Sequence, residues 1–423
     1  LIECKTYRTR AHAEGMSDFT YRTREDVASW KERCPIRRLV ERHGQLRSRF
    51  EEIEDEVAEL VRQARAFAEA SAVPEPASAT THVYAEPRRV VEPLRTTSAR
   101  ERTFVAATVE ALDHAMAKDP TIFVMGEGIG KRGGNFMTTQ GLYAKYGADR
   151  LCDTPICERG FVGLACGAAM TGTRPVIDFM FIDFINDSFG EIVNQIAKMQ
   201  YMSSGRLKMP VLLRGCGGVG HSAATHHSGL YHSIYSHIPG LRVVLPSNPF
   251  DAKGLMAHAL QSDDPVLFLE HRELMQTRGP VPEEQYEVPF GQARVVRPGT
   301  DVTVVALSLM VHHALEAAET LASEGVSVEV VDPRTVSPLD TDSILRSVSK
   351  TGRLLIVDEA FGPCGFAAEV AARVADAGFN DLDAPIKRLH GAFAPTPYAP
   401  TLERPVVPGV AQVVRALRDL LEE

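Results

Sequence analysis

The spacing of hydrophobic positions along the chain changes near residue 100. Before that point, a charged stretch over residues 49–70 places apolar side chains three or four positions apart. These side chains are Ile53, Val57, Leu60, Val61, Ala64 and Phe67. The spacing predicts one long amphipathic helix that packs on a neighbour. A shorter helix is expected over residues 23–33, where Thr23 and Asp26 are placed like a capping box, and residues 1–7 have the pattern of a strand.

After residue 102, short apolar runs alternate with helical segments. The first runs are TIFVMGE, PVIDFMF, PVLLRG, RVVLPS and PVLFLE, and VTVVAL, VSVEVVD and RLLIVDE follow after residue 300. This alternation predicts an α/β fold with mainly parallel sheets. It divides the region into an α/β domain over residues 99–285 and a smaller α/β domain over residues 286–423. Residues 71–98, rich in Pro, Ala, Ser and Thr without periodicity, indicate a linker.

Composition narrows the class of protein without naming a function. The 423 residues carry a net charge of −9, which gives no reason to expect nucleic acid or an anionic membrane as a partner. No apolar run approaches the length of a membrane span. The seven cysteines, which form no CxxC pair, are typical of reduced thiols in a cytoplasm or a mitochondrial matrix, and we prefer the cytoplasm. Because the chain starts at Leu1 inside a strand-like run, we expect sequence to precede it.

Five of the 14 histidines lie between His221 and His237, which raises the question of a metal site. His227, His232 and His237 are five residues apart and do not share one helix face, and no cysteine stands at zinc-ligand spacing nearby. The segment instead indicates a glycine-rich loop that runs into a helix capped by Ser228 and stopped by Pro239 and Gly240. His227 would then lie at the positive end of that helix, where a neutral imidazole is favoured and can exchange protons.

Longer motifs resemble a known family. Residues 100–423 resemble the β subunit of the thiamine-diphosphate-dependent 2-oxoacid dehydrogenases, through MGEGIG, GGNFMTTQGL, DTPICERGFVGLACGAAMTGTRPV, SHIPGLRVVLPSNPFDAKGL, DDPVLFLEH, DPRTVSPLD and TPYAPTLE. Residues 1–86 resemble the C-terminal end of the partner α subunit, through LIECKTYR, AHAEGMSD, YRTREDVASW and HVYAE. The resemblance implies a transketolase-like pyrimidine-binding domain over residues 99–285. A transketolase C-terminal-type domain over 286–423 would follow it, and an α-derived helical tail would precede both.

The resemblance also implies an activity and its partners. The family decarboxylates a 2-oxoacid oxidatively and passes the acyl group to the lipoyl group of a dihydrolipoyl acyltransferase. Its members hold the diphosphate and Mg²⁺ of thiamine diphosphate through a Gly-Asp-Gly motif on the α subunit, and this chain contains no Gly-Asp-Gly. We therefore expect the aminopyrimidine half of the cofactor site here, with Mg²⁺ held elsewhere. Cofactor sites of the family lie between subunits, which predicts a dimer with the tail packed on a neighbouring chain.

Four residues of the β-type region are expected at the cofactor. Glu158 matches the glutamate that hydrogen-bonds to the aminopyrimidine ring and promotes loss of the thiazolium proton. Glu127, at the end of a strand, is expected to line the same pocket. Phe184 matches the aromatic residue that stacks on the ring, and Met180 precedes it on the same side.

Four further residues are assigned by the same resemblance. His227 matches the histidine credited with proton transfer during lipoyl acylation. His12, in the α-type segment, matches a histidine that contacts the cofactor phosphate and the lipoyl arm, and Tyr7 and Arg8 are expected to help build that wall.

The resemblance leaves the substrate open. Met137, Cys157 and Asp187 differ from the residues usual in the family near the substrate pocket. Pyruvate, a branched-chain 2-oxoacid and acetoin are therefore all candidates, the last through the acetoin-cleaving relatives. A transketolase or deoxyxylulose phosphate synthase is a broader alternative. The non-enzymatic alternative is an inactive assembly module that binds an acyltransferase core.

Overall fold

The computed structural model describes residues 3–13, 15–93 and 100–423 of the chain. These residues form two compact units, residues 1–79 and residues 80–423, and each is considered by itself. None of the helices formed by the described residues combines the length and hydrophobicity that a membrane span requires.

The first unit is helical. Its α-helices are α1 (Arg24–Lys31), α2 (Pro35–Arg42) and α3 (Arg47–Ala70). The capped helix predicted over residues 23–33 is confirmed, because the Thr23 hydroxyl accepts a hydrogen bond from the amide of Asp26 at 3.1 Å. The strand expected over residues 1–7 is wrong for residues 3–7, which form no strand; residues 1 and 2 lie outside the described residues.

The long helix predicted over residues 49–70 is confirmed as α3, but its apolar stripe does not pack within its own unit. No residue of α3 is buried. The stripe is solvent-exposed, with exposed fractions of 40% at Ile53, 51% at Val57, 64% at Leu60, 61% at Val61 and 77% at Phe67.

The second unit begins with a sheet of seven strands in the order β12-β6-β7-β5-β4-β2-β3, as far as the described residues show. The strands are β2 (Ile122–Gly126), β3 (Leu151–Asp153), β4 (Arg174–Phe181), β5 (Leu212–Gly217), β6 (Arg242–Val244), β7 (Val266–His271) and β12 (Thr335–Ser337). Every neighbouring pair is parallel except β12 with β6. The predicted, mainly parallel α/β sheet is thus confirmed.

Helices cover both faces of this sheet, as the alternation of side chains along its strands requires. Val124, Val176 and Leu212 pack with α4 (Phe104–Lys118) and α9 (Pro249–Gln261). The next residues along the same strands, including Met125 and Ile177, pack with α6 (Glu158–Met170) on the other face. Other short helices of this region are α5 (Leu142–Tyr146), α7 (Met199–Met202) and α8 (His232–Ser236). The strands β1 (Glu101–Thr103) and β8 (Arg278–Pro280) form a separate antiparallel pair.

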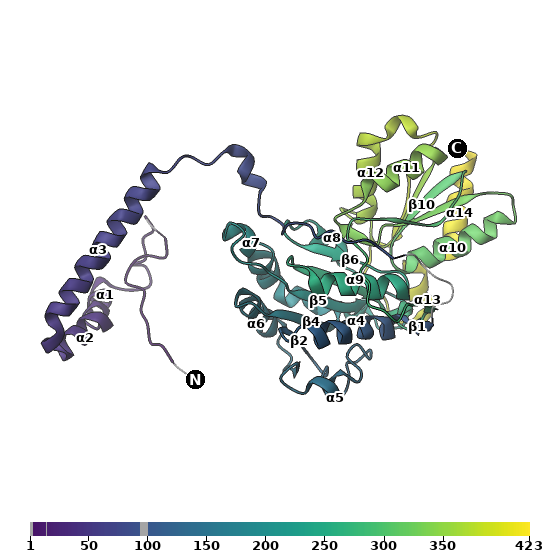
Figure 1. Ribbon diagram of the computed structural model, residues 1–423. Coiled ribbons are helices and arrows are strands. Elements are labelled where there is room, and N and C mark those ends of the chain that lie inside the picture. The colour runs from purple at the N-terminus through teal and green to yellow at the C-terminus, as the bar shows by residue number, and fades with distance from the viewer. Residues whose placement is uncertain (1–2, 14, 94–99) are drawn as a thin grey trace. The chain divides into compact units, whose positions relative to one another are not determined.

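A second sheet follows, with the strand order β14-β13-β10-β11-β9 among the described residues. Its strands are β9 (Arg294–Arg297), β10 (Val302–Ala306), β11 (Val328–Asp332), β13 (Leu354–Phe361) and β14 (Lys387–Gly391). One face packs on α10 (Leu309–Ala322) and α14 (Val410–Glu422), and the other on α11 (Thr341–Thr351) and α12 (Phe366–Ala377), as Figure 1 shows. The short helix α13 (Pro400–Glu403) precedes α14.

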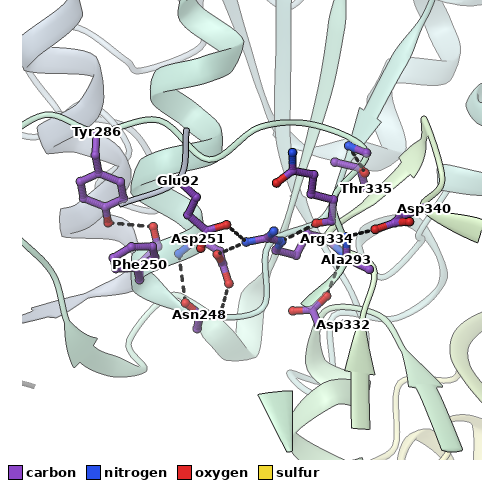
Figure 2. A network of polar contacts seen from close by, with 12 residues as sticks. Glu92, Asn248, Phe250, Asp251, Tyr286, Ala293, Asp332, Arg334, Thr335 and Asp340 are labelled. Atoms are coloured by element: carbon purple, nitrogen blue, oxygen red, sulfur yellow. Dashed lines mark hydrogen bonds and ion pairs between the residues drawn. The ribbon is translucent and has the colours of Figure 1, made fainter. Parts of the chain in front are cut away.

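The two sheets are joined by a buried polar network around Arg334 (Figure 2). Its guanidinium group contacts Glu92 at 2.8 Å and Asp251 of α9 at 3.1 Å, and its amide donates to Asp332 at the end of β11. Arg334 adopts φ = 61°, a backbone conformation that a non-glycine residue adopts only when its surroundings hold it. Burial and the charge of Asp251 raise the pKa of Asp332 to about 6.

Glu92 belongs to a segment, residues 82–92, that lies against the rest of the second unit and that we call the strap. The amide of Ala85 donates to Asp264 at 2.6 Å, and Arg88 forms two bonds to Glu287 at 2.9 and 3.0 Å. Arg242 lies 3.9 Å from the centre of the Tyr84 ring. The described second half of the predicted linker over residues 71–98 is therefore anchored, and residues 94–99 lie outside the described residues.

Candidate active site

Two carboxylates lie near each other where β2 ends and α6 begins. Glu127 directly follows β2, and Glu158 is the first residue of α6, where the helix dipole favours a negative charge. Gly126 allows this arrangement, because a Cβ atom there would lie 2.3 Å from the carbonyl oxygen of Asp178 in β4. Burial, and then the charge of Glu158, raise the pKa of Glu127.

Both carboxylates have free acceptor capacity. Glu158 is only 8% exposed, yet no described residue forms a hydrogen bond or ion pair with its side chain. The same holds for Glu127 among the described residues. The oxygens of both carboxylates still reach solvent, so they can accept hydrogen bonds from a ligand. The sequence prediction that places Glu158 and Glu127 at one site is consistent with this geometry.

An aromatic cluster surrounds His227. The ring of Phe181, the last residue of β4, lies edge-on to the imidazole with centroids 4.5 Å apart. Phe184 lies in a 3₁₀ turn that follows β4, with its centroid 5.6 Å from the same imidazole. Phe136 packs edge-on against Phe181 at 5.0 Å. The structure therefore brings Phe184 and His227 together. It adds Phe181, which ends the run PVIDFMF and which sequence reasoning missed.

Met180 occupies a constrained position beside this cluster. Its φ is 63°, and its amide donates to the Asp178 carboxylate at 2.9 Å. The other oxygen of Asp178 accepts from the Thr138 hydroxyl at 2.6 Å. Asp178 thus holds the end of β4 and the loop that contains Thr138 in one arrangement.

The helix predicted to start at Ser228 is wrong. His227 lies in a 3₁₀ turn over Thr225–His227, and α8 begins only at His232. The Ser228 hydroxyl donates to the carbonyl oxygen of Ala224 at 2.8 Å, so it does not accept from an amide as an N-cap does. His227 therefore does not lie at the start of an α-helix, and no helix dipole acts on it to favour the neutral imidazole.

The other histidines of the segment separate into different roles. His232 is fully buried, with its Nε2 3.1 Å from the Asp358 carboxylate, whereas His237 is exposed. His221 lies 2.7 Å from Glu273, and burial is the first cause that lowers its pKa.

Carboxylates of the second sheet hold the loop that leads to His227, and sequence reasoning missed them. The Glu359 carboxylate accepts from the Val219 amide at 2.6 Å and from Nε2 of His271 at 2.8 Å. Nε2 of His271 carries the proton, because Nδ1 accepts from the Glu273 amide at 3.1 Å. Glu403 of α13 accepts from the amides of the loop as well. The motif TPYAPTLE, which ends in Glu403, contained the only signal.

The remaining predicted residues belong to the first unit. Tyr7 stacks on Trp30 with ring centroids 5.0 Å apart and donates to Asp26 at 2.8 Å. Arg8 donates to the Tyr21 hydroxyl at 2.6 Å. Arg22, which sequence reasoning missed, bonds to the backbone of residues 8 and 10 and so shapes this loop. His12 is exposed on the same loop.

The fold and the paired carboxylates define a transketolase-type enzyme class, and family models agree. Residues 100–277 match "Transketolase, pyrimidine binding domain", residues 291–413 match "Transketolase, C-terminal domain", and residues 1–77 match "Dehydrogenase E1 component". Among solved structures, a split gene transketolase in an inactive β4 tetramer has a TM-score of 0.62 at 22% identity. It covers 75% of this chain and 97% of its own, and it supports the fold alone.

Curated relatives identify the family. The chain is 46% identical over 334 residues to the acetoin:2,6-dichlorophenolindophenol oxidoreductase β subunit of Cupriavidus necator, covering 77% of this chain and 98% of the relative. It is 42% identical to the 2-oxoisovalerate dehydrogenase β subunit of Bacillus subtilis, covering 76% and 98%. It is 43% identical to the pyruvate dehydrogenase E1 β subunit of Rickettsia felis, covering 73% and 95%. The chain belongs to the family of thiamine-diphosphate-dependent dehydrogenase E1 β subunits.

The described residues fit one half of thiamine diphosphate. Glu158 has carboxylate oxygens that can bond to the aminopyrimidine ring, and Phe181 and Phe184 supply apolar surface around His227. The described residues bring together no group of three His, Cys, Asp or Glu side chains that could hold a metal ion.

Proposed function

We propose that this chain is the aminopyrimidine-binding half of an enzyme that decarboxylates a 2-oxoacid oxidatively and transfers the acyl group to a lipoyl group. The observation that carries the proposal is the carboxylate of Glu158, a largely buried residue that has no hydrogen-bond partner among the described residues and lies next to Glu127. Bound thiamine diphosphate supplies a nucleophilic carbon and a ring that accepts the electron pair left by the departing carboxyl group.

The chain's own residues hold the cofactor and move protons. Glu158 hydrogen-bonds to the ring nitrogen of the aminopyrimidine and keeps it in the tautomer that takes up a proton. Glu127 and Met180 line the same pocket, and Phe184 packs on the ring. His227, 4.5 Å from Phe181 between ring centroids, exchanges a proton with the lipoyl sulfur during acyl transfer.

The first unit serves the opposite side of the cofactor in this proposal. His12 contacts the cofactor phosphate and the lipoyl arm, and Tyr7 and Arg8 hold the loop on which it lies. Mg²⁺ comes with a separate α-type segment, since this chain contains no Gly-Asp-Gly motif. The partners are a dihydrolipoyl acyltransferase and a second copy of the chain, and we assign the protein to the cytoplasm.

A second candidate substrate is acetoin. Two of the relatives, from Cupriavidus necator and Bacillus subtilis, are acetoin:2,6-dichlorophenolindophenol oxidoreductase β subunits, at 46% and 42% identity. Acetoin needs the same carboxylate and the same acceptor, so the site described here serves either substrate.

Dye reduction tests the proposal. The 423-residue chain is mixed with thiamine diphosphate, Mg²⁺ and a separately expressed α-type subunit, and dichlorophenolindophenol reduction is followed with pyruvate, a branched-chain 2-oxoacid and acetoin. We expect turnover of a 2-oxoacid. If acetoin alone is turned over, the protein is an acetoin-cleaving enzyme. If no substrate is turned over, the result favours the inactive assembly module.

A further inference from the structure

One arginine of the aromatic cluster has no charged partner among the described residues. Arg272 directly follows β7, and its guanidinium carbon lies 5.5 Å from the ring centre of Phe136 and 5.6 Å from that of Phe181. Phe181 is the same ring that contacts His227. Among the described residues, the Arg272 side chain forms no hydrogen bond and no ion pair. The side chain is half-buried.

The carboxylates along the same stretch of chain are already engaged. Glu270 bonds to the buried Arg214, with two contacts at 2.7 Å and one at 3.0 Å. Glu273 contacts His221 at 2.7 Å, and Glu359 accepts from His271 at 2.8 Å. These pairs leave Arg272 as a cation held between two aromatic rings without an anion of its own.

The rings orient Arg272 but do not satisfy it. A guanidinium group carries five N–H donors in a planar fork that matches a carboxylate, and a phenyl ring offers attraction for the charge but no lone pair. Holding such a fork half-buried beside the ring that contacts His227 leaves its donors available to an anionic ligand. Arg272 also acts on its surroundings as a charge, since it is one of the groups that lower the pKa of His221.

We propose that Arg272 binds the carboxylate of the 2-oxoacid substrate. This inference rests on the proposed function and assigns it a residue that sets substrate class, because a 2-oxoacid carries a carboxylate and acetoin carries none. The ion pair exists before the reaction. When the C1–C2 bond of the substrate breaks, the carboxyl group leaves as CO₂ and the bond's electron pair remains with the other fragment. Arg272 keeps its protons throughout.

This timing separates the effects on KM and kcat. An interaction that is present with bound substrate and is lost as CO₂ forms stabilises the ground state more than the transition state. For Arg272→Met we expect the KM for pyruvate to rise on the order of 10- to 100-fold, the range of a lost charged hydrogen bond. The kcat should stay unchanged or rise. The kinetic constants for acetoin should stay within about twofold of the wild-type values, because acetoin carries no carboxylate for Arg272 to bind.

Two matched variants accompany this measurement. Arg272→Lys keeps the charge but loses the planar fork, so it should restore part of the affinity for pyruvate. Arg278→Met removes an exposed arginine whose side chain has no polar partner among the described residues. It should leave the kinetic constants for pyruvate and for acetoin unchanged. Equal losses with pyruvate and acetoin, or no rise in KM for pyruvate, would overturn the proposal.

A second readout does not need turnover. Wild-type protein is treated with phenylglyoxal, with and without pyruvate, and modified arginines are identified by mass spectrometry. Pyruvate should protect Arg272 and leave Arg278 reactive. If the enzyme proves inactive on every 2-oxoacid, the proposed function fails, and protection still decides whether Arg272 binds a carboxylate. Absence of protection in a protein that turns over pyruvate overturns the Arg272 assignment alone.

Discussion

The amide of Ser222 donates to both oxygens of the Glu403 carboxylate, at 2.9 and 3.0 Å. The two residues lie 181 positions apart, and Glu403 is only 2% exposed. Glu403 also accepts from the Gly220 amide at 3.2 Å. A single buried carboxylate of the C-terminal region thus fixes the backbone that leads to His227.

Replacing Glu403 should loosen this loop. In Glu403→Ala, the amides of Gly220 and Ser222 lose their charged acceptor, and we expect the free energy of unfolding to fall by roughly 1–3 kcal/mol. Dye reduction should fall more than stability alone explains, because His227 is no longer positioned. Urea unfolding and dye reduction are measured together. Glu403→Gln keeps one acceptor oxygen, so its stability and dye reduction should lie between those of Glu403→Ala and the wild type. Glu319→Ala, at an exposed position of α10, is the control and should match the wild type.

Glu158→Gln tests the carboxylate on which the proposed function depends. Because no described residue bonds to Glu158, the substitution removes no native contact, and unfolding free energy should stay within about 1 kcal/mol of wild type. Dye reduction should fall at least about 100-fold, the usual scale for a lost general acid–base group. Near-normal turnover would remove Glu158 from its role. A large loss of stability would instead make it a structural residue.

Much of the fold could be predicted because its signals are local. Strands buried on both faces are continuous apolar runs, and Val124 and Met125 supply opposite faces of the first sheet in consecutive positions. The start of α1 was equally local, since Thr23 and Asp26 are three residues apart.

The missed features depend on partners far away in the sequence. Nothing near Ser228 reveals that its hydroxyl donates to Ala224 and leaves α8 to begin at His232. Nothing near Tyr84 reveals that its ring packs on Arg242. The candidate site shows the same division. Glu158 and His227 were found through a family motif, whereas Glu359 and Arg272 act through contacts that only the folded chain brings together.

The network around Arg334 predicts a pH-dependent stability. The folded-state pKa of Asp332, about 6, exceeds its ordinary value of 3.8 because the carboxyl group is buried and close to Asp251. A raised pKa means that the protonated carboxyl group favours the folded state. This contribution is complete below a pH of about 4 and is lost as the pH rises through about 6.

Asp332→Asn should therefore gain stability relative to wild type as the pH rises. The asparagine oxygen can still accept from the Arg334 amide, and the Ser247 hydroxyl can turn to accept from its NH₂ group. We expect a gain on the order of 2–3 kcal/mol at a pH of about 7.5, about half of that gain at a pH of about 5, and little difference at about 3. Urea unfolding across this range measures it, with the exposed Asp376→Asn as control. A gain that is equal at every pH would contradict the assignment.

The exposed stripe of α3 predicts self-association through the first unit. Side chains such as Leu60 and Val61, both more than 60% exposed, make an apolar surface that a single copy leaves in water. Leu60→Glu should weaken the dimer on the order of tenfold or more, since burying one leucine is worth about 1.5–3 kcal/mol. Sedimentation equilibrium measures the dissociation constant. Gln63→Glu adds the same charge to the same helix outside the stripe and should leave the constant unchanged. A wild-type chain that stays monomeric at all concentrations, or equal effects of both variants, would exclude α3 as the contact.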